Sequence, residues 1–178
     1  MEETGWKWRS DFDWSGQWPR RARVRLRERL PSHKPPWPIS VDGGAAEREL
    51  LKKYVEATEA ADFRVFESII RADATFRMPP QPDTAAGREA MFKLWVEEGF
   101  GSERFGRLHC VVTHANLQPA VAAYVCQPGD STWRALALDV LRIEDGLITE
   151  IVTFSPDTFP LFGLPMLMDP APEMNTCH

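Results

Sequence analysis

The sequence predicts an α+β domain in which three helices pack against one face of a curved antiparallel sheet. Two observations support this fold class. Apolar residues recur with a helical period between residues 46 and 95, and with a period of two between residues 108 and 154. Helical and β-like segments are also segregated along the chain instead of alternating, which is not the order of a parallel βαβ sheet.

The three helices are expected before residue 100. The first runs from Ala46 to about Ala60, the second begins after Asp62 as its N-cap, and the third follows Gly87. Between the second and the third lies a short β-like run, Ala74 to Met78, which two prolines end. This order places one isolated strand among the helices.

Four β-like runs follow Gly106, and their separators are rich in turn-forming residues. The runs are Leu108 to His114, Ala120 to Cys126, Trp133 to Ile143, and Leu147 to Phe154. The tripeptide Glu144-Asp145-Gly146 joins the last two runs and is typical of a hairpin turn. The four runs therefore predict an antiparallel meander.

Alternation sorts the longest run onto two faces. One face takes Trp133, Ala135, Ala137, Asp139, Leu141 and Ile143, and the other takes Arg134, Leu136, Leu138, Val140 and Arg142. Because both faces are apolar in the middle, we expect the helices to cover one and a second copy of the chain to cover the other, as a homodimer. The small side chains of Ala135 and Ala137 beside Asp139 are typical of a ligand cavity.

Composition divides the chain of 178 residues into a basic N-terminal extension and an acidic body. Residues 1–40 carry nine Lys and Arg against five Asp and Glu, whereas the remainder carries twelve against twenty-one. Tryptophan and proline also concentrate in the extension. We therefore expect an extension and linker over residues 1–45, one domain over 46–165 and a tail over 166–178.

The sequence lacks the features of membrane-spanning, secreted and cofactor-binding proteins. It has neither a run of about 18 apolar residues that would span a bilayer nor the basic flank of a signal peptide, so we expect a cytoplasmic protein without a membrane partner. The cysteines Cys110, Cys126 and Cys177 lack CxxC spacing and are interpreted as reduced thiols. No metal-ligand cluster, P-loop or nucleophile elbow is present, so no metal and no cofactor are expected.

Five segments of the chain carry a family resemblance. They are Lys53-Tyr54-Val55-Glu56-Ala57, Ala60-Ala61-Asp62, Ala72-Asp73-Ala74-Thr75-Phe76-Arg77-Met78-Pro79-Pro80, Gly87-Arg88-Glu89-Ala90 and Glu144-Asp145-Gly146-Leu147-Ile148. In this order they resemble the nuclear transport factor 2-like, or SnoaL-like, superfamily over about residues 46 to 162. The resemblance implies a cone-shaped curved sheet around three helices, a central pocket, and commonly a dimer.

Three further segments narrow the resemblance: Met78-Pro79-Pro80, Asn116 to Tyr124, and Phe159 to Pro165. They resemble the C-terminal domain of a group of extracytoplasmic-function sigma factors. The basic run Arg20 to Pro31 resembles the last helix of the DNA-binding region that precedes such a domain, and His33 to Gly44 resembles its linker. Without a helix-turn-helix in the sequence, association with RNA polymerase or DNA rests on this basic run. The alternative is a helix docked on the acidic body.

Tyr54 and Asp139 are the strongest candidates for a functional site. They resemble the tyrosine and the protonated aspartic acid that form the oxyanion hole of ketosteroid isomerases, members of the same superfamily. Two neutral donors in an apolar cavity would bind the oxygen of a carbonyl-bearing ligand. The isomerase base corresponds to Met78, and a thioether cannot take a proton. In the alternative interpretation, Tyr54 is a core aromatic residue and Asp139 a structural acid.

Other candidate ligand contacts are Phe76, Met78, Trp133 and His114. Alternation puts Phe76 and Met78 on one side of their strand and turns Arg77 away. His109 and His114 are an odd number of residues apart, so a regular strand places them on opposite faces, and either alone could act as an acid or base. Trp133, with Phe154 and Trp95, is expected to line an apolar pocket or to pack in the core.

Three hypotheses of function follow. The first is a non-catalytic domain that binds a small apolar or carbonyl-bearing ligand and regulates transcription. The second is a small isomerase or cyclase that uses Tyr54 and Asp139 as oxyanion donors, with an unidentified base. The third is an interaction protein that associates with polymerase or DNA through the basic extension.

Overall fold

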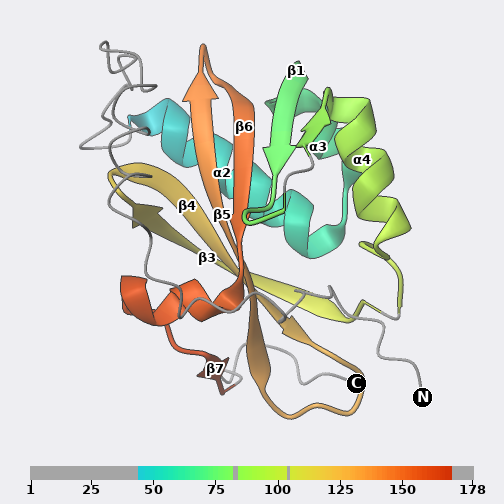
Figure 1. Cartoon of the computed structure of the whole chain (residues 1–178), viewed down its shortest axis with the longest axis vertical. Helices are drawn as coiled ribbons and strands as arrows, with labels where there is room; N and C mark the ends of the chain where they lie inside the picture. Colours follow the sequence, from blue (N-terminus) through green and yellow to red (C-terminus); the bar gives the residue numbers. More distant parts are fainter. Residues whose placement is uncertain (1–43, 82–83, 104, 170–178) are drawn as a thin grey trace, which may run out of the picture. The chain divides into compact units, whose positions relative to one another are not determined.

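The computed structural model of the chain describes residues 44–81, 84–103 and 105–169 (Figure 1). The predicted extension over residues 1–43, with its basic run and linker, and the tail from residue 170 lie outside the described residues. Within them, three helices form where helical periodicity predicts them. These helices are α2 (Ala45–Ala60), α3 (Phe63–Ile69) and α4 (Arg88–Glu97). Asp62 is the N-cap of α3, as expected, and its carboxylate accepts hydrogen bonds from the backbone of Arg64 and Val65.

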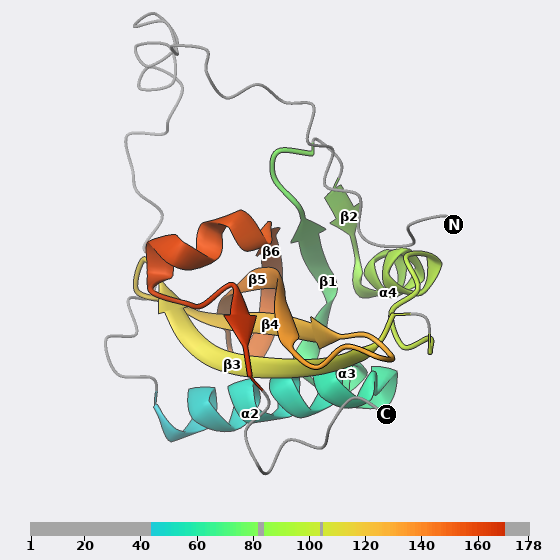
Figure 2. The ribbon, with the colours of Figure 1, turned by 90° about the horizontal axis from the view of Figure 1, so that it is seen from below.

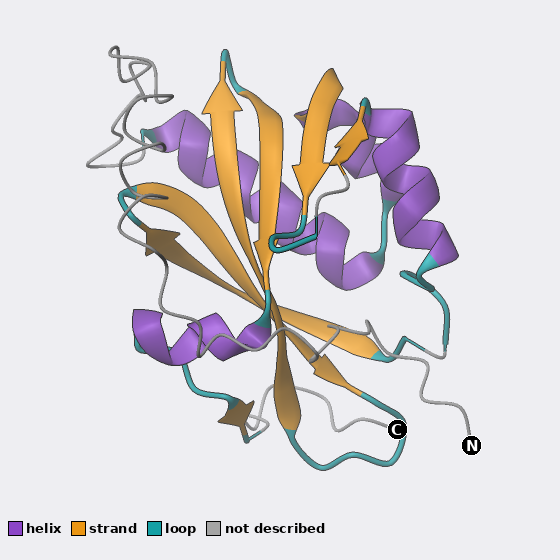
Figure 3. Cartoon of the chain, viewed as in Figure 1, coloured by secondary structure: helices purple, strands orange, loops and turns teal. Residues whose placement is uncertain are grey.

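The described strands form one curved sheet (Figure 3). They are β1 (Ile70–Arg77), β2 (Thr84–Ala86), β3 (Arg107–Ala115), β4 (Gln118–Cys126), β5 (Trp133–Glu144), β6 (Leu147–Phe154) and β7 (Leu167–Met168). The order across the sheet is β2-β1-β6-β5-β4-β3, and β7 pairs with one end of β5. The α+β fold class and the four-stranded meander are confirmed.

One pair of strands makes the sheet mixed. β1 lies parallel to β6, with Phe76 opposite Ile151, whereas the other pairs are antiparallel. The strand β2, the helix α4 and the first three strands of the meander separate β1 from β6 in the sequence. A long connection of this kind is what parallel neighbours require, because a two-residue turn joins only antiparallel strands.

The two faces of the sheet are covered by different parts of the chain. We call the face that carries Asp139 the inner face and the face that carries Leu138 the outer face. Helix α2 and the 3-10 helix η1 (Pro156–Phe162) lie on opposite sides of the sheet (Figure 2). Since Tyr54 of α2 bonds to Asp139, α2 covers the inner face.

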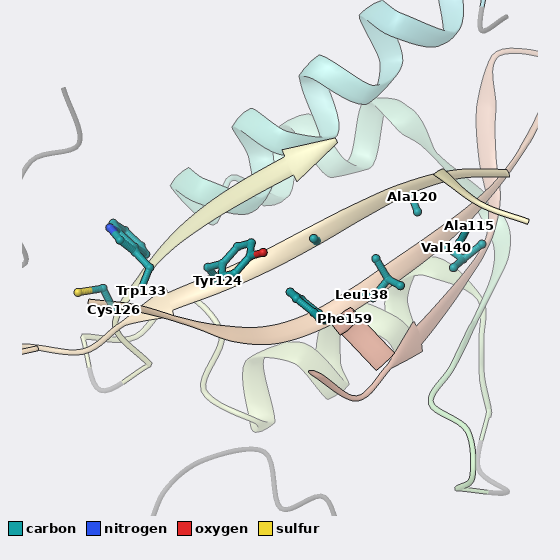
Figure 4. Close-up of a cluster of buried hydrophobic side chains, with 9 residues drawn as sticks. Ala115, Ala120, Tyr124, Cys126, Trp133, Leu138, Val140 and Phe159 are labelled. Atoms are coloured by element: carbon teal, nitrogen blue, oxygen red, sulfur yellow. The ribbon is translucent and has the colours of Figure 1, made fainter. Parts of the chain in front are cut away.

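An apolar cluster occupies the outer face (Figure 4). Its buried members are Ala115, Ala120, Ala122, Tyr124, Cys126, Trp133, Leu138, Val140 and Phe159. Phe159 comes from η1 and is fully buried, with its ring 5.3 Å from that of Tyr124. Part of the face on which a second copy was expected is therefore covered by the chain itself. The homodimer stays a prediction; Leu161 of η1, Met166, and Leu167 of β7 are exposed apolar residues near this cluster's end of the chain.

Two further expectations concern cysteines and membranes. Cys126 is disulfide-bonded, so the interpretation of all three cysteines as reduced thiols is wrong, whereas Cys110 is a free, buried thiol. Within the described ranges, no helix is both long enough and apolar enough to cross a bilayer.

Candidate functional site

Tyr54 and Asp139 meet on the inner face of the sheet. The Tyr54 hydroxyl donates a hydrogen bond of 2.9 Å to Asp139 Oδ2. Tyr54 lies on the apolar side of α2 and is only 2% exposed, and Asp139 lies in the middle of β5. The predicted convergence of these two side chains is therefore present in the structure.

Thr153 is the second partner of Asp139. Its hydroxyl donates to Asp139 Oδ1 at 2.5 Å, and the side chain is buried. Thr153 lies on β6 directly opposite Asp139. Each carboxylate oxygen of Asp139 thus accepts one hydroxyl hydrogen, from Tyr54 on one side and Thr153 on the other. We refer to these three residues as the triad.

Burial sets the protonation of the triad. Burial raises the pKa of Asp139, and the hydrogen bonds from Thr153 and Tyr54 oppose that rise because they stabilise the carboxylate. The pKa of Tyr54 is raised well above its ordinary value, first by burial and then by the nearby Asp139 charge. Tyr54 is therefore a neutral hydrogen-bond donor, and proton exchange in the triad belongs to Asp139.

Cys110 is a further polar neighbour that sequence reasoning did not include. It lies on β3 opposite Ala123, which is in turn opposite Ala137 on β5. Burial, followed by the charges of Glu59 and Asp139, raises the pKa of its thiol well above the ordinary value. Cys110 is therefore a neutral thiol beside the triad, without the thiolate that a nucleophile requires.

Aromatic rings form the apolar surroundings of Tyr54. The ring of Phe66 lies 5.6 Å from that of Tyr54, Trp95 of α4 lies 5.2 Å from Phe66, and Phe76 of β1 lies 5.7 Å from Trp95. Phe76 and Met78, both expected as ligand contacts, are buried. Phe76 shares the inner face because it is opposite Ile151, two residues before Thr153 on β6.

Asp139 is deep in the domain and yet keeps accessible surface. Its carboxyl group is strongly desolvated, but Asp139 and Ala137 both remain partly exposed. Tyr54, Thr153 and Cys110 around them are buried. Asp139 and the small side chain of Ala137 on the same face thus stay partly exposed among buried neighbours, and the ligand cavity stays a prediction.

Trp133 does not belong to this site. Its side chain is part of the outer-face cluster (Figure 4). Its ring lies 5.7 Å from that of His109. The prediction that Trp133 and Ala135 share a face with Asp139 is wrong because β5 contains a bulge. Tyr124 is opposite Ala135 and Ala123 is opposite Ala137, so Leu136 is an extra residue that reverses the alternation.

His114 and Arg77 lie elsewhere. His114 is exposed near the end of the edge strand β3, two strands away from Asp139, and β3 is regular, so His109 and His114 face opposite sides as expected. Arg77 pairs with Glu150 on the opposite side of the sheet from Phe76, which confirms that it is turned away. In the described parts of the chain, no three His, Cys, Asp or Glu side chains are grouped as a metal site.

Glu59 closes the edge of β3 near the site. Its Oε1 accepts a hydrogen bond of 2.8 Å from the Cys110 backbone nitrogen and lies 3.2 Å from His109 Nδ1. The last turn of α2 is thereby fixed to the sheet, which holds Tyr54 in register with β5. Nothing in the spacing of these residues along the sequence indicated this contact.

Comparison with known proteins gives a family. A model of the SnoaL-like domain matches residues 51–151. The chain is 30% identical over 146 residues to the ECF RNA polymerase sigma factor SigG of Mycobacterium tuberculosis, in each of two strains. This alignment covers 82% of the chain but only 38% of SigG, so the chain spans well under half the length of that relative.

Solved structures share the fold. An NTF2-like protein of unknown function from Burkholderia xenovorans aligns with a TM-score of 0.50 and 15% identity, over 61% of this chain and 80% of that one. A second NTF2-like protein of unknown function, from Mesorhizobium loti, aligns with a TM-score of 0.50 and 17% identity, over 64% of this chain and 93% of that one. At these identities the likeness concerns the fold alone.

Proposed function

The chain belongs to the SnoaL-like domain family, and from this premise we propose that it is a non-catalytic regulatory domain that binds a small, largely apolar ligand. The observation that carries the proposal is the hydrogen bond between Tyr54 and Asp139 on the inner face. Polar groups that converge in an otherwise aromatic environment provide an anchor for one polar atom of an apolar molecule. The accessible surface at Asp139 and Ala137 is where that atom would bind.

The residue at the base position of the related isomerases favours binding over catalysis. In the resemblance to ketosteroid isomerases, the base position is taken by Met78, which is buried and has no group that accepts a proton at neutral pH. The described groups that interact with Asp139 are Tyr54, Thr153 and Cys110. All three are neutral donors, and none is a general base near neutral pH.

A link to transcription is supported by the similarity of this chain to a sigma factor. SigG is a sigma factor, and 82% of this chain aligns with 38% of it. We propose that the domain regulates transcription by responding to its ligand. Association with RNA polymerase or DNA through the basic residues between 20 and 31 belongs to the same proposal and rests on their charge.

A matched pair of probes tests ligand binding. 2-Acetylnaphthalene carries a carbonyl oxygen, and 2-ethylnaphthalene has nearly the same shape without it. Calorimetric titration of the full chain should give micromolar to millimolar binding of both, with the ketone bound several-fold more tightly, as one hydrogen bond allows. The Asp139→Leu variant, which removes the carboxyl group, should lose this preference, whereas Asp139→Asn keeps donor hydrogens at this position and should retain it. Trp133→Phe, on the outer face, is the control and should keep it.

Two results would overturn the proposal. One is binding of neither probe, and the other is a ketone preference that survives in Asp139→Leu. Loss of the preference in Trp133→Phe would instead contradict the assignment of faces.

The second candidate function is a small isomerase or cyclase. One observation favours it: a buried carboxyl group with a raised pKa contacts a neutral phenol, as an oxyanion hole requires. Such an enzyme would remove hydrogens next to a bound carbonyl. Mass spectrometry of 2-acetylnaphthalene incubated with the chain in D₂O should show no deuterium above the buffer control. Incorporation that disappears in Tyr54→Phe would establish catalysis in place of simple binding.

A further inference from the structure

We propose that Thr153 sets the pH at which the site changes from a ligand that donates a hydrogen bond to a carbonyl ligand, and that a carbonyl ligand binds together with one proton. This inference rests on the proposed function and deepens it. Nothing in the family resemblance assigns a role to Thr153; its position opposite Asp139 comes from the structure.

The number of donor hydrogens in the triad limits which ligand groups it can bind. A hydroxyl group has one hydrogen to donate. The hydrogen of Tyr54 is used on Asp139 Oδ2 and that of Thr153 on Asp139 Oδ1. When Asp139 is ionised, the triad therefore offers only lone pairs. In that state it suits a ligand hydroxyl or amine, which donates, and not a ligand carbonyl, which accepts.

Protonation of Asp139 changes the preference from a ligand group that donates a hydrogen bond to one that accepts it. With Asp139 protonated, the triad holds three hydrogens but needs only two for its internal bonds, so one remains to donate to a carbonyl oxygen. The proton comes from solvent and stays within the triad, and no covalent bond to the ligand forms. The alternative, in which Tyr54 turns toward the ligand while Asp139 is ionised, leaves a buried carboxylate with a single donor, which is costly.

Thr153 sets the pH at which this change occurs. Its hydroxyl bonds to the charged form of Asp139 and so favours ionisation. The titratable groups that face Asp139 from the neighbouring elements are Tyr54 of α2 and Cys110 of β3. The pKa values of both are raised well above their ordinary values, so both stay neutral near pH 7 and the proton in question is that of Asp139. Glu59 lies at the edge of β3, where it contacts His109 and the Cys110 backbone.

The first experiment measures the titration without any ligand. Carbon NMR of the full chain, labelled at aspartate carboxyl groups, follows the midpoint of Asp139, assigned by its absence in Asp139→Asn. Thr153→Val removes the hydroxyl with little change of shape and should raise the midpoint by about one pH unit or less, the effect of one hydrogen bond. Thr153→Ser keeps the hydroxyl and should restore the wild-type midpoint.

The second experiment measures the ligand preference against pH. The preference for 2-acetylnaphthalene over 2-ethylnaphthalene should be present below the Asp139 midpoint and fall toward zero above it. In Thr153→Val the fall should move to higher pH by the same amount as the NMR midpoint, so that between the two midpoints the variant binds the ketone several-fold more tightly than wild type. 2-Naphthol can donate a hydrogen bond, so its affinity should fall less above the Asp139 midpoint than the affinity of 2-acetylnaphthalene.

Failure of this inference and failure of the proposed function are distinguishable. A midpoint that is the same or lower in Thr153→Val, or a ketone preference that does not change with pH, overturns the role of Thr153 even if the probes bind. Binding of no probe to wild type overturns the proposed function, and the NMR midpoint still decides whether Thr153 controls the proton.

Discussion

Tyr54 and Asp139 are 85 residues apart in the sequence and share a hydrogen bond of 2.9 Å between α2 and β5. The bond crosses from the helical layer to the centre of the sheet. Thr153, from the neighbouring strand, completes the same group. A helix, a strand and the next strand along the sheet thus each contribute one member of the triad.

The Tyr54 hydroxyl should contribute to stability, and another buried tyrosine gives the control. Tyr54→Phe removes the bond to Asp139 but keeps the ring packed on Phe66, so the free energy of unfolding should fall by about 1 kcal/mol. The Tyr124 hydroxyl is buried without a hydrogen-bond partner among the described residues. Tyr124→Phe should therefore change stability by less than about 0.5 kcal/mol or raise it. Urea unfolding of the two variants measures these changes. Equal losses of unfolding free energy would contradict the stabilising role of the Tyr54–Asp139 hydrogen bond.

Asp139 should make stability depend on pH in a defined direction. Because its folded pKa is raised above the ordinary 3.8, the folded state holds the proton at a pH where the unfolded state has lost it. The free energy of unfolding therefore falls as pH rises from about 3.8 to the raised pKa, by at most about 1.4 kcal/mol per pH unit, and levels off above it.

Asp139→Asn isolates this contribution. The difference in unfolding free energy between wild type and the variant should shift against wild type as pH rises through that window. Urea unfolding at half-unit steps of pH measures it. A difference that is constant with pH, or that moves in favour of wild type, would show that the folded pKa of Asp139 is not raised.

Phe159 should hold η1 on the outer face. Its side chain is 0% exposed, whereas that of Leu161, two residues later in the same short helix, is 80% exposed. Phe159→Ala should lower the free energy of unfolding by about 3–5 kcal/mol, and Leu161→Ala should change it by no more than about 0.5 kcal/mol. Chemical denaturation compares them. Similar small effects of both would mean that η1 does not cover the sheet.

Much of the fold follows from local pattern because the helices and the meander are built from strongly periodic segments. The run Leu147 to Phe154 has the predicted bounds, and Asp62 caps α3 as its position indicates. The parallel pairing of β1 with β6 was not predictable in this way. It brings together segments about 75 residues apart, and no local period reports on such a contact.

The site was predictable only where strands are regular. The hairpin at Asp145 and Gly146 alone would place Val152 opposite Asp139. A bulge after Arg142 leaves Thr149 without a partner in the register and brings Thr153 there instead. The second bulge, at Leu136, turns Trp133 to the outer face. Tyr54 and Asp139 were expected as a pair because they resemble the oxyanion-hole residues of ketosteroid isomerases; Thr153 was missed and Trp133 misplaced because each lies beyond a bulge.

The most direct test of the central claim is the infrared spectrum of bound 2-acetylnaphthalene labelled with carbon-13 at its carbonyl group. A hydrogen bond to the oxygen lowers the carbonyl stretching frequency. If the ligand binds at Tyr54 and Asp139, the band below the Asp139 midpoint should lie at lower frequency than in an apolar solvent, and should return toward the apolar value in Asp139→Leu, which removes the carboxyl group. A band at the apolar frequency in wild type, or one unchanged in Asp139→Leu, would contradict binding at this site.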